Sequence, residues 1–257
     1  MSLQDKHALV TGGSTGIGAA IAVALAEAGA KVTITGRTRA PLDALVAKHP
    51  GMRAVVADVT DEAQIAAAFR AAVEANGPLS IVVANAGAAE SAPFARTSLD
   101  AFRRMIDVNL TGVFITLREG MGAMTGSGWG RLVVIASIAG LEGHAYASAY
   151  SAAKHGAVGL VRTLAIETAG TGITVNAVCP GYTATPMLER SVKTIMEKTR
   201  RSDDEARRVL AQSNSDGRIV QPSEVAEIVL RLCGPDSENI TGQAIRIPEP
   251  IREIAHA

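Results

Sequence analysis

Three side chains at suggestive spacing could carry out acid–base chemistry on an oxygen atom. Tyr150 and Lys154 are four positions apart, one helical turn, and Ser137 precedes the tyrosine by thirteen positions. A phenol can donate or accept a proton, and a nearby ammonium favours its ionised form. A serine hydroxyl can hold an oxygen on which negative charge develops. Each residue alone has an ordinary explanation, as an amphipathic pair or a helix cap, but together they predict proton transfer to a carbonyl or from an alcohol.

A glycine-rich segment near the N-terminus could bind a dinucleotide. It runs from Thr11 to Gly18 with the order Thr-Gly-Gly-Ser-Thr-Gly-Ile-Gly, after an apolar run and before an alanine-rich one. Glycines let the backbone turn sharply and approach a pyrophosphate at a helix N-terminus. A plain tight turn would also need glycine, but the strand–turn–helix context favours nucleotide binding. The expected cofactor contacts in this turn are Gly12, Ser14, Thr15, Gly16, Ile17 and Gly18.

The end of the second predicted strand indicates which dinucleotide binds. An NAD site usually has an acidic residue about 20 positions beyond the glycine turn, to bind the ribose hydroxyl. Here the segment 35–39 contains Arg37 and Arg39 and no carboxylate. Since an arginine can pair with a 2′-phosphate, we expect NADP, with NAD the less favoured cofactor. The alternative is that both arginines are solvated charges at the start of a helix.

Further cofactor contacts are expected where the next two strands end. Asp58, followed by Val59, could accept a hydrogen bond from the adenine amino group, or it could cap the helix beginning near Asp61. Asn85, Ala86 and Gly87 end the fourth strand, and the two small residues leave room for a ribose or a flat ring. Open α/β sheets bind ligands at this carboxyl edge.

Short apolar segments alternate with alanine-rich stretches of helical length along the whole chain. This pattern predicts an α/β fold, a doubly wound parallel sheet in a single domain covering residues 1–257. The segment from Tyr182 to Gly217 is polar and interrupts the rhythm, so we expect a helical substrate lid there; a solvated helix pair without a role is the alternative. The predicted strands are His7–Val10, Lys31–Thr35, Ala54–Ala57, Leu79–Ala84, Leu132–Ala136, Thr174–Val178 and Ala244–Ile247.

Bulk composition narrows the possible classes. The chain has 257 residues, 47% of them hydrophobic and 19% charged, with a formal net charge of +0. This composition supports a large core and argues against nucleic-acid binding over the whole surface. We expect no membrane span, no secretion signal and no metal site. Cys179 and Cys233 are far apart, so we expect no disulfide framework and a cytoplasmic protein.

The motifs together resemble those of the short-chain dehydrogenases/reductases. They are Thr11–Gly18, 85–87, Asn109, Ser137, Tyr150 with Lys154, and Pro180-Gly181, in the family's order. The stretches 173–181 and 221–227 look most like 3-oxoacyl reductases and aromatic-polyketide ketoreductases. The resemblance implies a Rossmann-like seven-stranded sheet, a homo-oligomer (tetramer or dimer) and a catalytic tetrad of Asn109, Ser137, Tyr150 and Lys154. It also implies cofactor contacts from Tyr150, Lys154, Pro180, Gly181, Thr183 and Thr185, and a water held by Asn109 that relays protons to Lys154.

The expected activity is NADP-dependent interconversion of a ketone and a secondary alcohol. The favoured substrate is a 3-oxoacyl thioester on an acyl carrier protein (ACP) or coenzyme A (CoA). The reason is a basic cluster that could bind the phosphate of either carrier, formed by Arg200, Arg201, Arg207 and Arg208. Salt bridges within a helix are the alternative role for these arginines. Two other hypotheses are an NAD(P)-dependent dehydrogenase of a small alcohol or sugar, and a non-catalytic nucleotide-binding scaffold. The segment 245–250 departs from the family pattern, which puts the C-terminal subunit contact in doubt.

Overall fold

Seven parallel strands form one sheet in a computed structural model that describes residues 2–248. Their order is β3-β2-β1-β4-β5-β6-β7, so the chain reverses its direction of winding between β1 and β4. This is a Rossmann-like doubly wound sheet, which confirms the predicted fold class. The strands are β1 His7–Thr11, β2 Lys31–Gly36, β3 Met52–Val56, β4 Ile81–Ala84, β5 Gly130–Ile135, β6 Ile173–Pro180 and β7 Ala244–Ile247.

The central strands are buried on both faces, as their continuous apolar sequences require. All residues of β1, β4, β5 and β6 are buried. The register pairs Val10 with Val83, and Ile135 with Val178, so neighbouring strands end at nearly the same level. Segments that are distant in sequence therefore meet at the carboxyl edge of the sheet.

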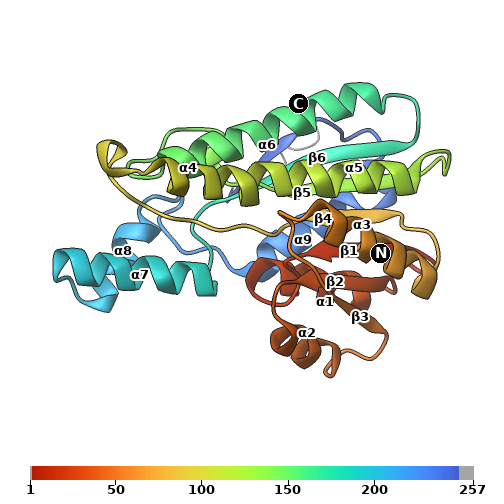
Figure 1. The fold of residues 1–257 in the computed structure, drawn as a ribbon, viewed down its shortest axis with the longest axis horizontal. Coiled ribbons are helices and arrows are strands. Elements are labelled where there is room, and N and C mark those ends of the chain that lie inside the picture. The colour runs from red at the N-terminus through yellow and green to blue at the C-terminus, as the bar shows by residue number, and fades with distance from the viewer. Residues whose placement is uncertain (1, 249–257) are drawn as a thin grey trace.

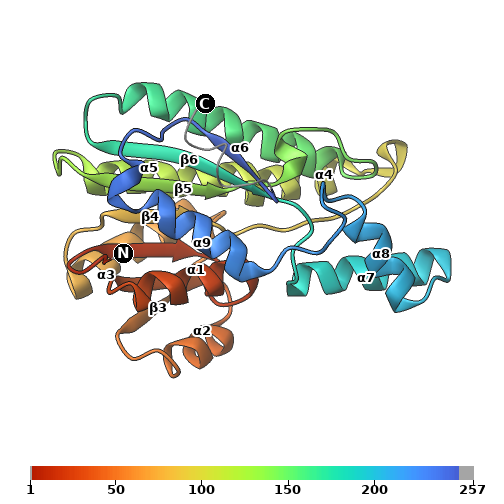
Figure 2. The ribbon, with the colours of Figure 1, turned by 180° about the vertical axis from the view of Figure 1, so that it is seen from behind.

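Helices cover both faces of the sheet (Figures 1 and 2). On one face, α1 (Gly16–Glu27), α2 (Arg39–Val46) and α9 (Pro222–Leu232) contribute to one hydrophobic core, in which Leu25 and Val229 are fully buried. On the other, α3 (Glu62–Asn76), α5 (Gly112–Met124) and α6 (Ser148–Glu167) form the second core, and α4 (Leu99–Ile106) packs against α6. Gly29, with φ of +97°, follows the end of α1 as predicted.

The segment from Tyr182 to Gly217 contains two helices that project to one side of the sheet (Figures 1 and 2). Helices α7 (Pro186–Thr199) and α8 (Asp203–Ala211) pack through a small core of their own, which includes Leu188 and Leu210. The segment's two ends are joined, because the Tyr182 backbone N–H donates to Asn214 Oδ1 at 2.8 Å. The expected helical segment is present; whether it acts as a lid stays a prediction.

Strand ends differ from the predicted bounds by a few residues. β3 begins at Met52 and ends before Ala57, and β5 begins at Gly130 rather than Leu132. The predicted strand excluded the charged Arg131, but this residue is only 1% exposed. Its guanidinium carbon lies 4.2 Å from the centre of the Trp129 ring, and its Nη1 donates to two backbone carbonyls. Glu249 and Pro250, part of the atypical C-terminal segment, lie outside the described residues.

Candidate active site

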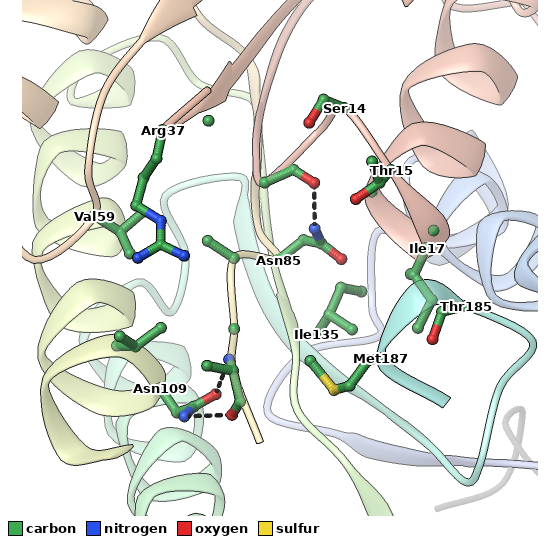
Figure 3. A pocket seen from close by; sticks show the side chains of 18 of the residues that line it. Ser14, Thr15, Ile17, Arg37, Val59, Asn85, Asn109, Ile135, Thr185 and Met187 are labelled. Atoms are coloured by element: carbon green, nitrogen blue, oxygen red, sulfur yellow. Dashed lines mark hydrogen bonds between the residues drawn. The ribbon is translucent and has the colours of Figure 1, made fainter. Parts of the chain in front are cut away.

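A cavity of about 480 Å³ opens at the carboxyl edge of the sheet, where the predicted site residues were expected to meet (Figure 3). Its volume is in the range typical of ligand sites. The predicted residues that line it are Gly12, Ser14, Thr15, Gly16, Ile17, Gly18, Arg37, Asp58, Val59, Asn85, Ala86, Gly87, Asn109, Tyr150, Lys154 and Thr185. Ser137, Pro180, Gly181 and Thr183 were also predicted but are not among its lining residues.

The glycine turn forms one wall of the cavity and could not accept larger residues. Gly12 and Gly16 have φ of +63° and +55°, values that favour glycine. A Cβ on Gly18 would lie 2.3 Å from the Gly12 carbonyl oxygen and 2.4 Å from Asn85 Nδ2. That Asn85 amide donates to the carbonyls of Thr11 and Gly12 at 2.9 and 3.1 Å, so it holds the turn against β4 (Figure 3). The side chain thus supports the backbone cradle that a pyrophosphate would occupy.

The two arginines after β2 have different surroundings. Arg37 lines the cavity, and its side chain lies near Val59 in Figure 3. Arg39 is instead 3.6 Å from Asp43 on the surface of α2, so the solvated-charge interpretation holds for this residue. A guanidinium in the cavity at the position of Arg37 suits an anionic ligand.

Asp58 and Val59 line the cavity beyond β3. Asp58 Oδ1 accepts hydrogen bonds from the backbone N–H and hydroxyl of Thr60, at 3.0 and 2.8 Å. The cap of α3 is Asp61, whose Oδ1 accepts from the Gln64 N–H at 3.0 Å. Asp58 as the helix cap, one of the two alternatives, is therefore wrong, and its second carboxylate oxygen has room to accept from a ligand.

Tyr150 and Lys154 line the cavity, and Ser137 lies beside Tyr150. Tyr150 and Lys154 lie in the first turns of α6, and the Lys154 ammonium is 5.7 Å from the centre of the phenol ring. Lys154 Nζ also donates to the Ile135 carbonyl at 2.9 Å, which fixes it against β5. Ser137, just after β5, accepts from the Ala139 N–H at 3.1 Å, and its hydroxyl lies close enough to the Tyr150 phenol to lower the pKa of that group. The structure therefore joins the three groups that spacing suggested.

The electrostatics of this group differ from the expectation. Burial raises the pKa of Tyr150 to about 12, against a smaller opposite effect of the neighbouring Ser137 hydroxyl. Burial also lowers the pKa of Lys154 to about 8, and this lysine is only 3% exposed. The expectation that the lysine makes the phenol more acidic is thus wrong: burial decides the pKa of Tyr150, and the ammonium 5.7 Å from the ring centre does not lower it below the ordinary value. At neutral pH the phenol is protonated and can donate.

Asn109 occupies a π-helical segment, residues Asp107–Thr111, between α4 and α5. Its side chain is fully buried; Nδ2 donates to the carbonyls of Ala88 and Met105, and Oδ1 accepts from the Ala88 N–H at 3.2 Å. These bonds, two of which Figure 3 shows, attach the π-helical segment to the chain beyond β4. π-bulges are frequent at functional sites. The side chain thus braces one wall of the cavity, and its role in holding a relay water stays a prediction.

The predicted contacts beyond β6 divide into two groups. Pro180 is the last residue of β6, the Gly181 N–H donates to the Ile247 carbonyl at 2.9 Å, and the Thr183 hydroxyl donates to the Gly181 carbonyl at 2.9 Å. All three lie outside the cavity lining and shape the chain that leads into α7. Thr185 lines the cavity and caps α7, accepting from the Leu188 N–H at 3.3 Å.

Several cavity residues were not predicted. Most flank predicted ones at strand ends, namely Gly36, Thr38, Ala57, Ala88, Ile135 and Ala136, whereas Pro41 lies in α2 and Val108 in the π-helical segment. Pro186, Met187 and Arg190 come from α7. A signal for the last two existed in the sequence, because residues three apart share one face of a helix that starts at Thr185. The direction of that face could not be read without the fold.

The strand order and the glycine turn at the switch point define a dinucleotide-binding α/β protein of the Rossmann type. A family model described as "short chain dehydrogenase" matches residues 6–195. The chain therefore belongs to the short-chain dehydrogenase family, which confirms the resemblance and makes it an oxidoreductase.

Individual relatives cover almost the whole chain. A putative ketoacyl reductase of Streptomyces coelicolor is 38% identical over 96% of this chain and 97% of its own. An acetoacetyl-CoA reductase of Rhizobium meliloti is 40% identical over 94% and 96% of the two chains. A crystal structure of an actinorhodin polyketide ketoreductase variant with NADPH superposes with a TM-score of 0.91, at 37% identity, covering 96% of this chain and 97% of that one. Within residues 2–248, none of the helices has the length and apolar character needed to span a bilayer.

Proposed function

We propose that this protein is an NADP-dependent reductase of a 3-oxoacyl group carried as a thioester on ACP or CoA. The observation that carries the proposal is a single cavity lined by the glycine turn, Arg37, Tyr150 and Lys154, with Ser137 beside the tyrosine. The names of two relatives, a ketoacyl reductase and an acetoacetyl-CoA reductase, support the substrate class. The relative crystallised with NADPH supports the cofactor.

The residues present fit a dinucleotide with a 2′-phosphate. The glycine turn leaves a backbone cradle that a Cβ at Gly18 would fill, and Arg37 supplies a positive charge further along the cavity. Asp58 would accept from the adenine amino group and Lys154 would donate to the nicotinamide ribose. When bound, NADPH supplies the hydride that the protein lacks.

Three side chains would handle the proton and the reacting oxygen. Tyr150, protonated because burial raises its pKa, would donate its proton to the carbonyl oxygen as negative charge develops there. Ser137, beside Tyr150, would turn its single hydroxyl proton toward that oxygen and hold it there. Lys154, with a pKa lowered to about 8, could return a proton toward the tyrosine near neutral pH.

The test compares Tyr150→Phe with a matched tyrosine. The protein has three tyrosines, and Tyr146 is 65% exposed, so Tyr146→Phe is the control. Turnover of acetoacetyl-CoA with NADPH is expected to fall about 10²- to 10⁴-fold in Tyr150→Phe, with the Kd for NADPH retained. The control is expected to keep both values. Near-normal turnover in Tyr150→Phe would contradict the catalytic role, and absence of wild-type turnover across 3-oxoacyl thioesters and simple ketones would contradict the reductase proposal.

The carrier contact and the assembly are part of the same proposal. Arg207 is one of the four basic residues that could meet a carrier phosphate, but its charge is neutralised by ion pairs with Glu189 and Asp203. Arg200, Arg201 and Arg208 remain for that role.

We propose a cytoplasmic homo-oligomer, a tetramer or dimer. The two buried free cysteines support a cytoplasmic location. The apolar side chains of Phe114 on α5 and Ile166 on α6, 45% and 78% exposed, support a subunit contact. Light scattering after size exclusion would measure its mass.

A further inference from the structure

The first turn of α7 lies against the glycine turn. Thr185 caps this helix, and a Cβ built on Gly16 would be 3.1 Å from Thr185 Cγ2 and 3.7 Å from Pro186 Cδ. The glycine turn is where the cradle would receive a pyrophosphate. Side chains on the cavity side of the first two turns of α7 therefore line the same cavity as the glycine turn.

Arg190 is one such side chain. It follows Pro186 by four positions and Met187 by three, so the three residues share a face of α7, and all three line the cavity. Arg37 lines the same cavity from the end of β2. The cavity wall thus carries two guanidinium-bearing residues, from elements more than 140 positions apart in the sequence.

Glu189, the acidic residue next to Arg190 in the sequence, forms an ion pair with Arg207 instead. Glu189 accepts from Arg207 Nη1 at 2.9 Å and from its Nη2, and Arg207 Nε reaches Asp203 at 2.8 Å. This cluster connects α7 to α8 on the outer side. Among residues 2–248, no carboxylate forms an ion pair with Arg190. A charge that borders a ligand cavity without an acidic partner is available to an anionic ligand.

We propose that Arg190 binds the pyrophosphate of the bound dinucleotide and thereby attaches the α7–α8 segment to the cofactor. This inference rests on the proposed function, because it needs a dinucleotide in the cavity. Two arginines would then bind different phosphates of the cofactor. Arg37 would bind the 2′-phosphate that distinguishes NADP from NAD, and Arg190 would bind the pyrophosphate that both cofactors contain. Arginine suits both tasks because its planar fork matches phosphate oxygens.

The test uses ligands that separate the two phosphates. Dissociation constants are measured for NADPH, NADH and adenosine 2′-monophosphate with Arg190→Ala, Arg190→Lys and Arg37→Ala. The control is Lys193→Ala, also on α7, whose ammonium lies 3.9 Å from Glu197 and is 78% exposed. Circular dichroism of each variant checks that α7 remains folded.

Arg190→Ala is expected to weaken NADPH and NADH equally, by about tenfold, the lower end for a charge-assisted hydrogen bond. It is expected to leave adenosine 2′-monophosphate unaffected, with partial recovery in Arg190→Lys. Arg37→Ala should weaken NADPH and adenosine 2′-monophosphate and spare NADH. Lys193→Ala should change none of the three by more than about twofold, because exposed charges contribute little.

Three results would overturn the assignment of Arg190. An altered NADPH-to-NADH ratio in Arg190→Ala would place it at the 2′-phosphate instead. Unchanged dinucleotide affinities with a raised KM for the thioester would make it a substrate contact, and unchanged values throughout would leave it no role. All three leave the proposed function standing, whereas wild-type protein that binds neither dinucleotide would refute the proposed function and this inference together.

Discussion

A methyl group added at Gly18 tests whether the glycine turn is built as tightly as the structure shows. The new Cβ of Gly18→Ala would lie 2.3 Å from the Gly12 carbonyl oxygen and 2.4 Å from Asn85 Nδ2. Ordinary contacts are about 3.5 Å, so one or both groups must move by about 1 Å. The shorter contact can be relieved only if the backbone of the turn moves, and the Asn85 amide, which bonds to that carbonyl, is then displaced as well.

The cost follows from what that amide holds. Asn85 Nδ2 donates to the Thr11 and Gly12 carbonyls, and each hydrogen bond contributes about 1 kcal/mol. Crowding a well-packed site costs roughly a further 1–3 kcal/mol. Alanine's better helix propensity returns up to about 1 kcal/mol, so the expected loss of unfolding free energy is about 3 kcal/mol. In a protein of this size that corresponds to a midpoint lowered by about 6–12 °C.

The assay follows thermal unfolding by fluorescence of Trp129, the single tryptophan, and titrates each variant with NADPH. Gly159→Ala is the control, since this glycine lies within α6 and no atom is within 4 Å of a Cβ built there. We expect it to raise stability by about 0.5–1 kcal/mol and leave NADPH binding unchanged. Gly18→Ala that unfolded at the wild-type midpoint and bound NADPH normally would refute this account of the turn.

Two further outcomes follow from side chains away from the cofactor cavity. Burial holds the pKa of His7 below 6.5, so as pH falls through that value the unfolded chain binds a proton that the folded protein does not readily accept. The difference between the unfolding midpoints at pH 7.5 and pH 5.5 should therefore be larger in the wild type than in His7→Asn. Arg246 Nη2 lies 2.9 Å from Oε2 of Glu142, which is in the segment between Ser137 and Tyr150. Glu142→Arg and Arg246→Glu alone should each raise the KM for the ketone and leave the Kd for NADPH unchanged. The double variant, which swaps the two charges, should recover about 1 kcal/mol, and no recovery would exclude a positioning role for the pair.

The elements that position the site were largely predictable from the sequence. Continuous β-branched and apolar runs such as Ile81–Ala84 indicate strands buried on both faces, and the alternation with helices fixes a parallel sheet. Once the strands are parallel, residues that follow them must gather at one edge. That is why Arg37, Asp58 and Asn85 could be expected to line one cavity, although 21 and 27 positions separate neighbours in that series.

Other features depended on three-dimensional packing that no local pattern carries. Arg131 belongs to a buried strand because Trp129 and two carbonyls surround its guanidinium. Arg190 enters the cavity because α7 folds back over the glycine turn, which the polar sequence of this segment does not specify. Asn109 was placed through the family resemblance, while its bonds to the backbone of Ala88 emerge only from the fold.

The acid–base pair shows how burial assigns roles that spacing leaves open. A separation of four residues brings Lys154 near Tyr150, and in water that arrangement would favour phenolate beside ammonium. In the folded protein, burial disfavours both charges, so the pKa of Tyr150 rises to about 12 while that of Lys154 falls to about 8. The tyrosine is then a stable proton donor at neutral pH, and the lysine is the group whose proton is exchanged most readily. A phenol that keeps its proton at neutral pH can donate it in carbonyl reduction, and oxidation of an alcohol through the same group is expected to become faster as pH rises.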